Sequence, residues 1–104
     1  LLALRAANPS AILLVEPSIL GLISSGDLPS LGENLAGLAP DDHTIIGDVR
    51  VTAVGGQHAV IHRDIPRIGN VGYVLRSEGQ PTLFHPGDSY DTVPNGIDIL
   101  AVPA

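Results

Sequence analysis

The chain has no cysteine, which excludes both a disulfide framework and a thiolate metal site. Basic residues are also scarce, because five Lys and Arg stand against eleven Asp and Glu and the formal net charge is −6. The one local basic group is Arg63 with Arg67, and the negative charge of Asp64 between them partly cancels their positive charge. Nucleic acids and anionic membranes are bound by several cations on one face, so neither is expected as a partner.

Long hydrophobic runs are absent too. No apolar run approaches the ~18 residues that cross a bilayer, and no signal peptide is visible. With the lack of cysteine, this predicts a cytoplasmic protein. The 104 residues suffice for one small domain. The chain begins in a helix-like run and stops directly after an apolar strand, so we expect residues 1–104 to be a single partial domain, a fragment of a longer protein.

Helical and strand patterns alternate in the first forty residues, which is typical of α/β organisation. Pro17 suits the first turn of a helix, and Ser30 and Glu33 have the spacing of a capping box. The expected elements are a helix over 1–7, a buried parallel strand over 11–15, a helix over 18–24, and another from 30 to 35 or 38.

Strands dominate after Pro40. Gly47 and Asp48 fit a two-residue hairpin turn of type II′. In the strand that follows, Val49, Val51 and Ala53 alternate with more polar positions, so they are expected to share one face. The expected strands cover 43–46, 49–54, 70–76, 81–85 and 97–102. The predicted fold class is therefore α/β, with a mixed β-sheet and flanking short helices.

Two residues follow apolar strands directly and are the candidate metal ligands, His58 and Asp88. His58 comes after Gly55 and Gly56, which let the backbone turn sharply, and neutral imidazole is a common zinc ligand. A carboxylate at a strand end can ligate a metal, act as a base or cap the next turn. On spacing alone, a hydrogen-bonded structural histidine and a capping aspartate remain open alternatives.

A second histidine, His62, lies four residues after His58, which on a helix is the spacing of zinc proteases. The intervening residues favour a strand, Pro66 forbids a helix, and no Glu follows His58, so this motif is rejected. We expect His62 and Asp64 to lie in a loop near the site, where either is a candidate contact to substrate.

These features combine in two segments, GGQHAVIHRDIPRIGNVGYVL (residues 55–75) and LFHPGDS (residues 83–89). Together they resemble the metallo-β-lactamase-fold hydrolases, in particular the branch that includes ascorbate-6-phosphate lactonase. The resemblance runs from about Thr44 to Pro103. His58 matches a ligand histidine of that family, and Asp88 matches the aspartate of its Gly-Asp turn, which bridges two metals.

The resemblance implies a central part of an αββα sandwich and a hydrolase with two divalent ions, zinc or manganese. In such an enzyme a water activated by the metals attacks an ester, lactone or phosphoester of a small-molecule substrate. The family's His-x-His-x-Asp-His motif and its last ligand histidine are absent here. Two ligands are fewer than the three that a catalytic zinc takes from its protein, so the chain alone is expected to be inactive.

A different class of function also fits the sequence. Part of a sandwich fold, without the rest, leaves apolar surface of its sheet and helices exposed. Large exposed apolar patches drive association. The chain is then a noncatalytic piece that self-associates, as a homo-oligomer or with the rest of a longer protein. A small-molecule-binding module without metal is a third reading, supported only by the long loops.

Overall fold

The computed structural model describes residues 2–27, 30, 32–55 and 70–103. The chain divides into two compact units, Leu1–Leu38 and Ala39–Ala104. None of the helices in the described ranges is long and apolar enough to cross a membrane.

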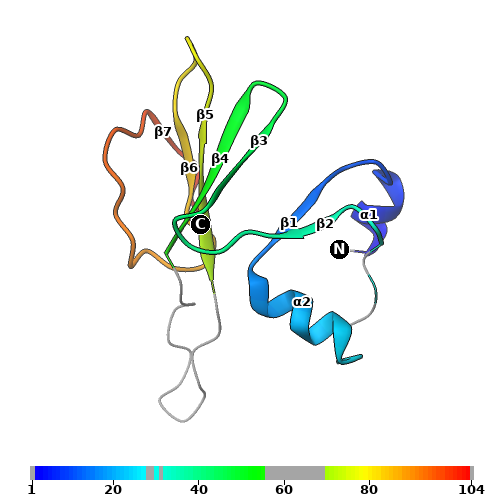
Figure 1. Cartoon of the computed structure of the whole chain (residues 1–104). Coiled ribbons are helices and arrows are strands. Elements are labelled where there is room, and N and C mark those ends of the chain that lie inside the picture. The colour runs from blue at the N-terminus through cyan, green and yellow to red at the C-terminus, as the bar shows by residue number, and fades with distance from the viewer. Residues whose placement is uncertain (1, 28–29, 31, 56–69, 104) are drawn as a thin grey trace. The chain divides into compact units, whose positions relative to one another are not determined.

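The first unit contains two short helices and a parallel pair of strands (Figure 1). Helix α2 begins at Pro17, as predicted, and the Glu16 carboxylate caps it by accepting from the Ser18 backbone N–H at 2.9 Å. Strand β1 pairs with β2 in parallel, which confirms the predicted orientation, although β1 is only half-buried. The bounds are α1 (Leu2–Ala7), β1 (Leu13–Val15), α2 (Pro17–Ser24) and β2 (Leu35–Gly37).

The helix expected from residue 30 onward is wrong, because Leu35–Gly37 forms strand β2. Gly32 has a φ of +93°, a left-handed conformation that a right-handed helix does not contain. Ser30 accepts from the Gly32 N–H at 3.4 Å, a local turn of the kind that competes with helix formation. Pairing with β1 then fixes the following residues in extended form, so a tertiary contact overrides the capping signal.

The second unit is a five-stranded mixed sheet of order β3-β4-β5-β6-β7. Neighbouring strands run antiparallel from β3 to β6, and β7 lies parallel to β6. This confirms the predicted α/β class with a mixed sheet and short helices. The bounds are β3 (His43–Ile46), β4 (Val49–Gly55), β5 (Val71–Arg76), β6 (Leu83–His85) and β7 (Ile99–Leu100).

The first hairpin agrees with its prediction. Ile46 pairs with Val49, and of the two turn residues only Gly47 has a positive φ, +60°, as a type II′ turn requires. In β4 the alternation is also confirmed, because Val51 and Ala53 are buried while Arg50 is exposed.

The core of this unit lies on the central strands. Val74 of β5 is 1% exposed, and the other buried hydrophobic residues of this unit are Val51, Ala53, Val71 and Phe84. The last strand is shorter than predicted, since only Ile99–Leu100 pairs with β6 and both residues are exposed. The segment that connects β6 to β7 leaves the sheet at one end and returns to the other, where Asp98 and Ile99 donate to the Thr82 carbonyl (Figure 1, orange).

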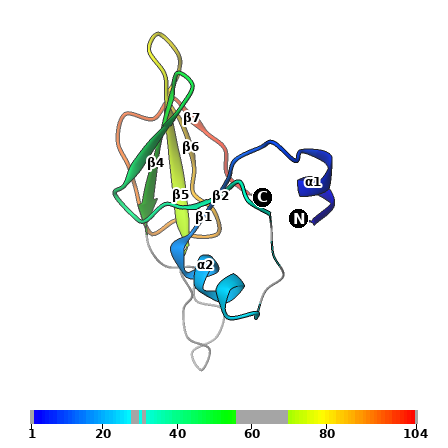
Figure 2. The same cartoon turned by 45° about the vertical axis from the view of Figure 1, so that its right-hand side comes forward.

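The sheet therefore has two distinct ends. The turns of the β3–β4 and β5–β6 hairpins lie together at one end, at the top of Figures 1 and 2. At the other end β4 stops at Gly55, β5 starts at Val71 opposite Gly55, and β6 stops at His85. The candidate ligands follow β4 and β6, so it is this second end that positions the candidate site.

Candidate functional site

The candidate site is built where β4 and β6 end on either side of the start of β5. Gly55 pairs with Val71, and His85 pairs with Tyr73, so both strand ends flank the same short stretch of β5. Antiparallel neighbours reverse direction at each step, which brings the ends of alternate strands to one edge. The chain therefore leaves the sheet toward His58 and toward Asp88 at the same end.

Asn70, which directly precedes β5, holds the turn that carries Asp88. Its side-chain Nδ2 donates to the Pro86 carbonyl at 3.2 Å, and its Oδ1 accepts from the Asp88 backbone N–H at 3.1 Å. One partly buried amide thus satisfies a donor and an acceptor of a loop 16 to 18 residues away. The sequence pattern predicts Asn70 only as the start of a strand and carries no signal of this role, because its bonding partners are remote in the chain.

Gly87 permits that arrangement. Its φ is +70°, and a Cβ at this position would lie 2.6 Å from Asn70 Oδ1 and 3.0 Å from the Val71 carbonyl oxygen. Any other residue would have to displace Asn70 or the backbone of β5. The Gly-Asp sequence therefore reflects a close approach between the turn and the start of β5.

His85 also forms a hydrogen bond within this turn. Its Nδ1 accepts a hydrogen bond from the Gly87 backbone N–H at 3.1 Å, which puts the proton of a neutral ring on Nε2. The exposed imidazole thus has one nitrogen occupied within the turn. Asp88, in the same turn, is exposed.

The residues after Asp88 fold over this end of the sheet. Ser89 is buried, and its Oγ accepts from the Asp91 N–H at 3.3 Å. Gly55 has a φ of +94°, and a Cβ there would meet Thr92 Oγ1 at 3.1 Å. A cavity of about 20 Å³ lies beneath, with Asn70, Ser89 and Thr92 in its lining, which is room for one water molecule and no larger ligand.

A metal ion is not accommodated by these residues alone. Among the described residues no group of three or more His, Cys, Asp or Glu is placed to hold an ion. Asp91 also lies at this end, in the lining of the small cavity. Two further carboxylates, Asp41 and Asp42, precede β3 and bond to Ala53 of β4 through their backbones. Strand β3 lies three positions from β6 in the sheet, a separation of about 14 Å, too far for these residues to share an ion with Asp88.

Of the residues predicted for the site, only Asp88 falls in the described part of the chain. His58, His62 and Asp64 lie outside the described residues, as does Gly56. That the His58 and Asp88 side chains lie close together, as two ligands of one metal centre, therefore stays a prediction.

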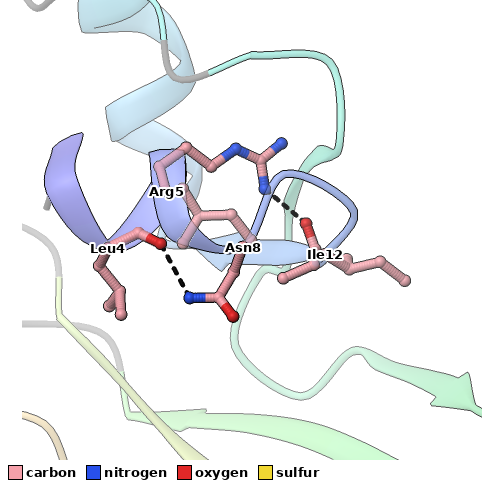
Figure 3. A pocket seen from close by; sticks show the side chains of 6 residues that line it. Leu4, Arg5, Asn8 and Ile12 are labelled. Carbon is pink, nitrogen blue, oxygen red and sulfur yellow. Dashed lines mark hydrogen bonds between the residues drawn. The ribbon is translucent and has the colours of Figure 1, made fainter.

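The first unit contains an apolar hollow of about 270 Å³ between α1 and the start of β1 (Figure 3). The polar side chains in its lining are both bonded to backbone, since Asn8 Nδ2 donates to the Leu4 carbonyl at 3.0 Å and Arg5 donates to the Ala11 carbonyl. These bonds close the connection from helix to strand. The hollow is thus a structural feature without groups free for chemistry, and it is not the candidate site.

Comparison with known proteins identifies a relative of this chain. It is 36% identical over 98 residues to Protein Rv0786c of Mycobacterium tuberculosis, a match that covers 93% of this chain. The chain spans 42% of the length of that relative. No protein-family model matches the chain. No solved structure matches it either.

Proposed function

We propose that this chain forms one side of the active site of a metal-dependent hydrolase with a metallo-β-lactamase sandwich fold. The observation that carries the proposal is the common end of β4 and β6, from which the chain leads to His58 and to Asp88. The sequence resemblance over residues 44–103 assigns ligand roles to these same two residues. The longer relative, of which this chain spans 42%, is consistent with further ligands from other parts of a longer protein.

In this proposal the chain's own residues fix the backbone that carries one metal-binding carboxylate. Asn70 and His85 hold the backbone of the Pro86–Asp88 turn through three hydrogen bonds, which leaves Asp88 at the edge of the sheet. A ligand on a turn braced by a rigid sheet loses little conformational freedom when it binds. Asp88 would bridge two ions, His58 would bind one of them, and His62 or Asp64 would contact substrate.

The chemistry that two bound divalent ions supply to such a hydrolase is a water of lowered pKa, ready to attack an ester, lactone or phosphoester. Zinc or manganese suits a set of imidazole and carboxylate ligands. The 104 residues provide two of these ligands, and a catalytic zinc requires three from its protein, so the isolated chain is expected to be inactive.

Metal titration by calorimetry tests the proposal. The isolated chain should bind Zn²⁺ or Mn²⁺ only weakly, without a sub-micromolar stoichiometric site, because water would fill most of the coordination sphere. In the longer protein that we propose contains this chain, Asp88→Asn and His58→Ala should each lower metal content and hydrolysis of a simple phosphoester or ester.

The matched control is Asp42→Asn, which removes a carboxylate from the same end of the sheet but three strands away from Asp88. It should leave both metal content and hydrolysis unchanged. A tight zinc site in the isolated chain that disappears in His58→Ala would mean that other residues of this chain complete the coordination shell. Full metal content in Asp88→Asn would remove the site assignment altogether.

A second candidate, noncatalytic self-association, is favoured by the edge strand β7. Ile99 and Leu100 of this strand are 46% and 64% exposed, and Val93 in the preceding segment is 81% exposed. An edge strand provides unpaired backbone N–H and C=O groups for pairing with another strand, and exposed apolar side chains favour the association further. A second copy of the chain would cover this edge.

A further inference from the structure

Two of the chain's five basic residues stand directly opposite each other at the hairpin end of the sheet. Arg50 of β4 pairs with Arg76 of β5 in the antiparallel ladder. Opposed residues of such a pair project from the same face with Cβ atoms about 4.5–5.5 Å apart. Both side chains are exposed, so the two guanidinium groups face solvent together.

This placement is unfavourable unless a counter-charge is present, because like charges directly opposite destabilise a sheet. Asp48 and Glu78 line the same hollow and are the nearest candidates for that counter-charge. Within the described ranges, however, the side chains of Arg50 and Arg76 form neither an ion pair nor a hydrogen bond. In a chain of net charge −6, two adjacent arginines that have no partner among the described residues indicate an external one.

The surface around the arginines forms a shallow, open hollow. A hollow of about 540 Å³ opens here between the two hairpins, and Ser77 and Thr82 contribute to its lining beside the arginines. Arginine presents a planar fork of donors that matches a phosphate in bidentate fashion, and hydroxyl groups add further donors. The site thus combines positive charge, donors and space for a small ligand.

We propose that Arg50 and Arg76, with the hydroxyls of Ser77 and Thr82, bind the phosphoryl group of a small phosphate monoester. Asp48 and Glu78 in the same lining would repel an extended polyanion but accept hydrogen bonds from hydroxyl or amino groups on the organic part of the ligand. This selects a small polar phosphate ester over a nucleic-acid backbone.

The proposed phosphate site is separate from the proposed metal site. Arg50 and Gly55 lie five residues apart along β4, which is about 17 Å of extended strand, and the two positions are at opposite ends of the sheet. The phosphate proposal therefore does not rest on the proposed hydrolase function, and each can fail without the other.

Titration of the full 104-residue chain with inorganic phosphate at constant ionic strength tests the proposal, observed through the Nε–Hε signals of the arginines by NMR. We expect saturable shifts of the two signals that disappear in Arg50→Gln and Arg76→Gln, and little response of the others. Each single variant should weaken phosphate binding about tenfold, since losing one charge-assisted hydrogen bond costs at least ~1.4 kcal/mol. Phenyl phosphate should bind at least as well as phosphate.

Further variants and two other anions serve as controls. Arg5→Gln removes the same charge from the first unit and should leave the phosphate response intact. Arg76→Lys keeps the charge but loses the planar fork, so it should bind phosphate more weakly than the unmodified chain, and it serves as the test if a glutamine variant fails to fold. A saturable response in the Arg50→Gln/Arg76→Gln double variant, or acetate or chloride binding as tightly as phosphate, would overturn the proposal.

Discussion

At the scale of single residues, Gly87 is the position where the turn is most tightly constrained. We predict that Gly87→Ala lowers the free energy of unfolding by about 2–4 kcal/mol, combining the cost of a left-handed alanine with displacement of the Asn70 side chain. Chemical denaturation of the pure chain measures the change.

The matched control is Gly79→Ala, in the turn between β5 and β6. Gly79 has a similar φ of +74°, but nothing lies within 4 Å of a Cβ built there. Its substitution should therefore cost only the conformational part, about 1–2 kcal/mol. Equal destabilisation by the two alanines would show that the contact between Gly87 and Asn70 adds nothing to the stability of the turn.

At the scale of elements, the second unit depends on its central strand β5. Val74 is 1% exposed and is flanked in register by Thr52 of β4 and Phe84 of β6. We predict that Val74→Ala destabilises the chain by about 2 kcal/mol through lost burial and a residual cavity. A thermal melt with Val93→Ala as control tests this, because Val93 is 81% exposed and its truncation should change stability by less than about 0.5 kcal/mol. Similar melting temperatures for the two variants would place the stabilising core elsewhere.

At the scale of the whole molecule, apolar surface remains exposed along one edge of the sheet. A groove of about 400 Å³ beside β7 is lined by Phe84, Val93, Leu100 and Val102, and all but Phe84 are exposed. Covering apolar surface stabilises by about 25 cal/mol per Å². We therefore predict that the isolated chain associates at micromolar concentration, as light scattering on a sizing column would show.

Leu100→Lys should shift this equilibrium toward the monomer, because lysine on an edge strand opposes pairing with a second strand. Ile45→Lys is the matched control, since Ile45 is 61% exposed on the opposite edge strand β3. A well-behaved monomer with a cooperative melt would show instead that the 104 residues need no further cover.

Local sequence alone was enough to predict the features whose interactions lie within a few residues. The helix at Pro17, the turn at Gly47 and the alternation along β4 follow from backbone preferences and a period of two, and the structure confirms them. Likewise, His58 and Asp88 were found as candidates because each follows a strand closely in the sequence.

Only the tertiary structure decided the features that depend on pairing between remote segments. Leu35–Gly37 forms a strand because it pairs with β1. Of the strand predicted over 97–102, only two residues are paired, because the neighbouring strand β6 is short. The hydrogen bonds of Asn70 join it to Pro86 and Asp88, which lie 16 and 18 residues away. The strand register sets Arg50 opposite Arg76, 26 residues away. No local pattern fixes such a register, because it is set by hydrogen bonds and packing that form only when the whole sheet assembles.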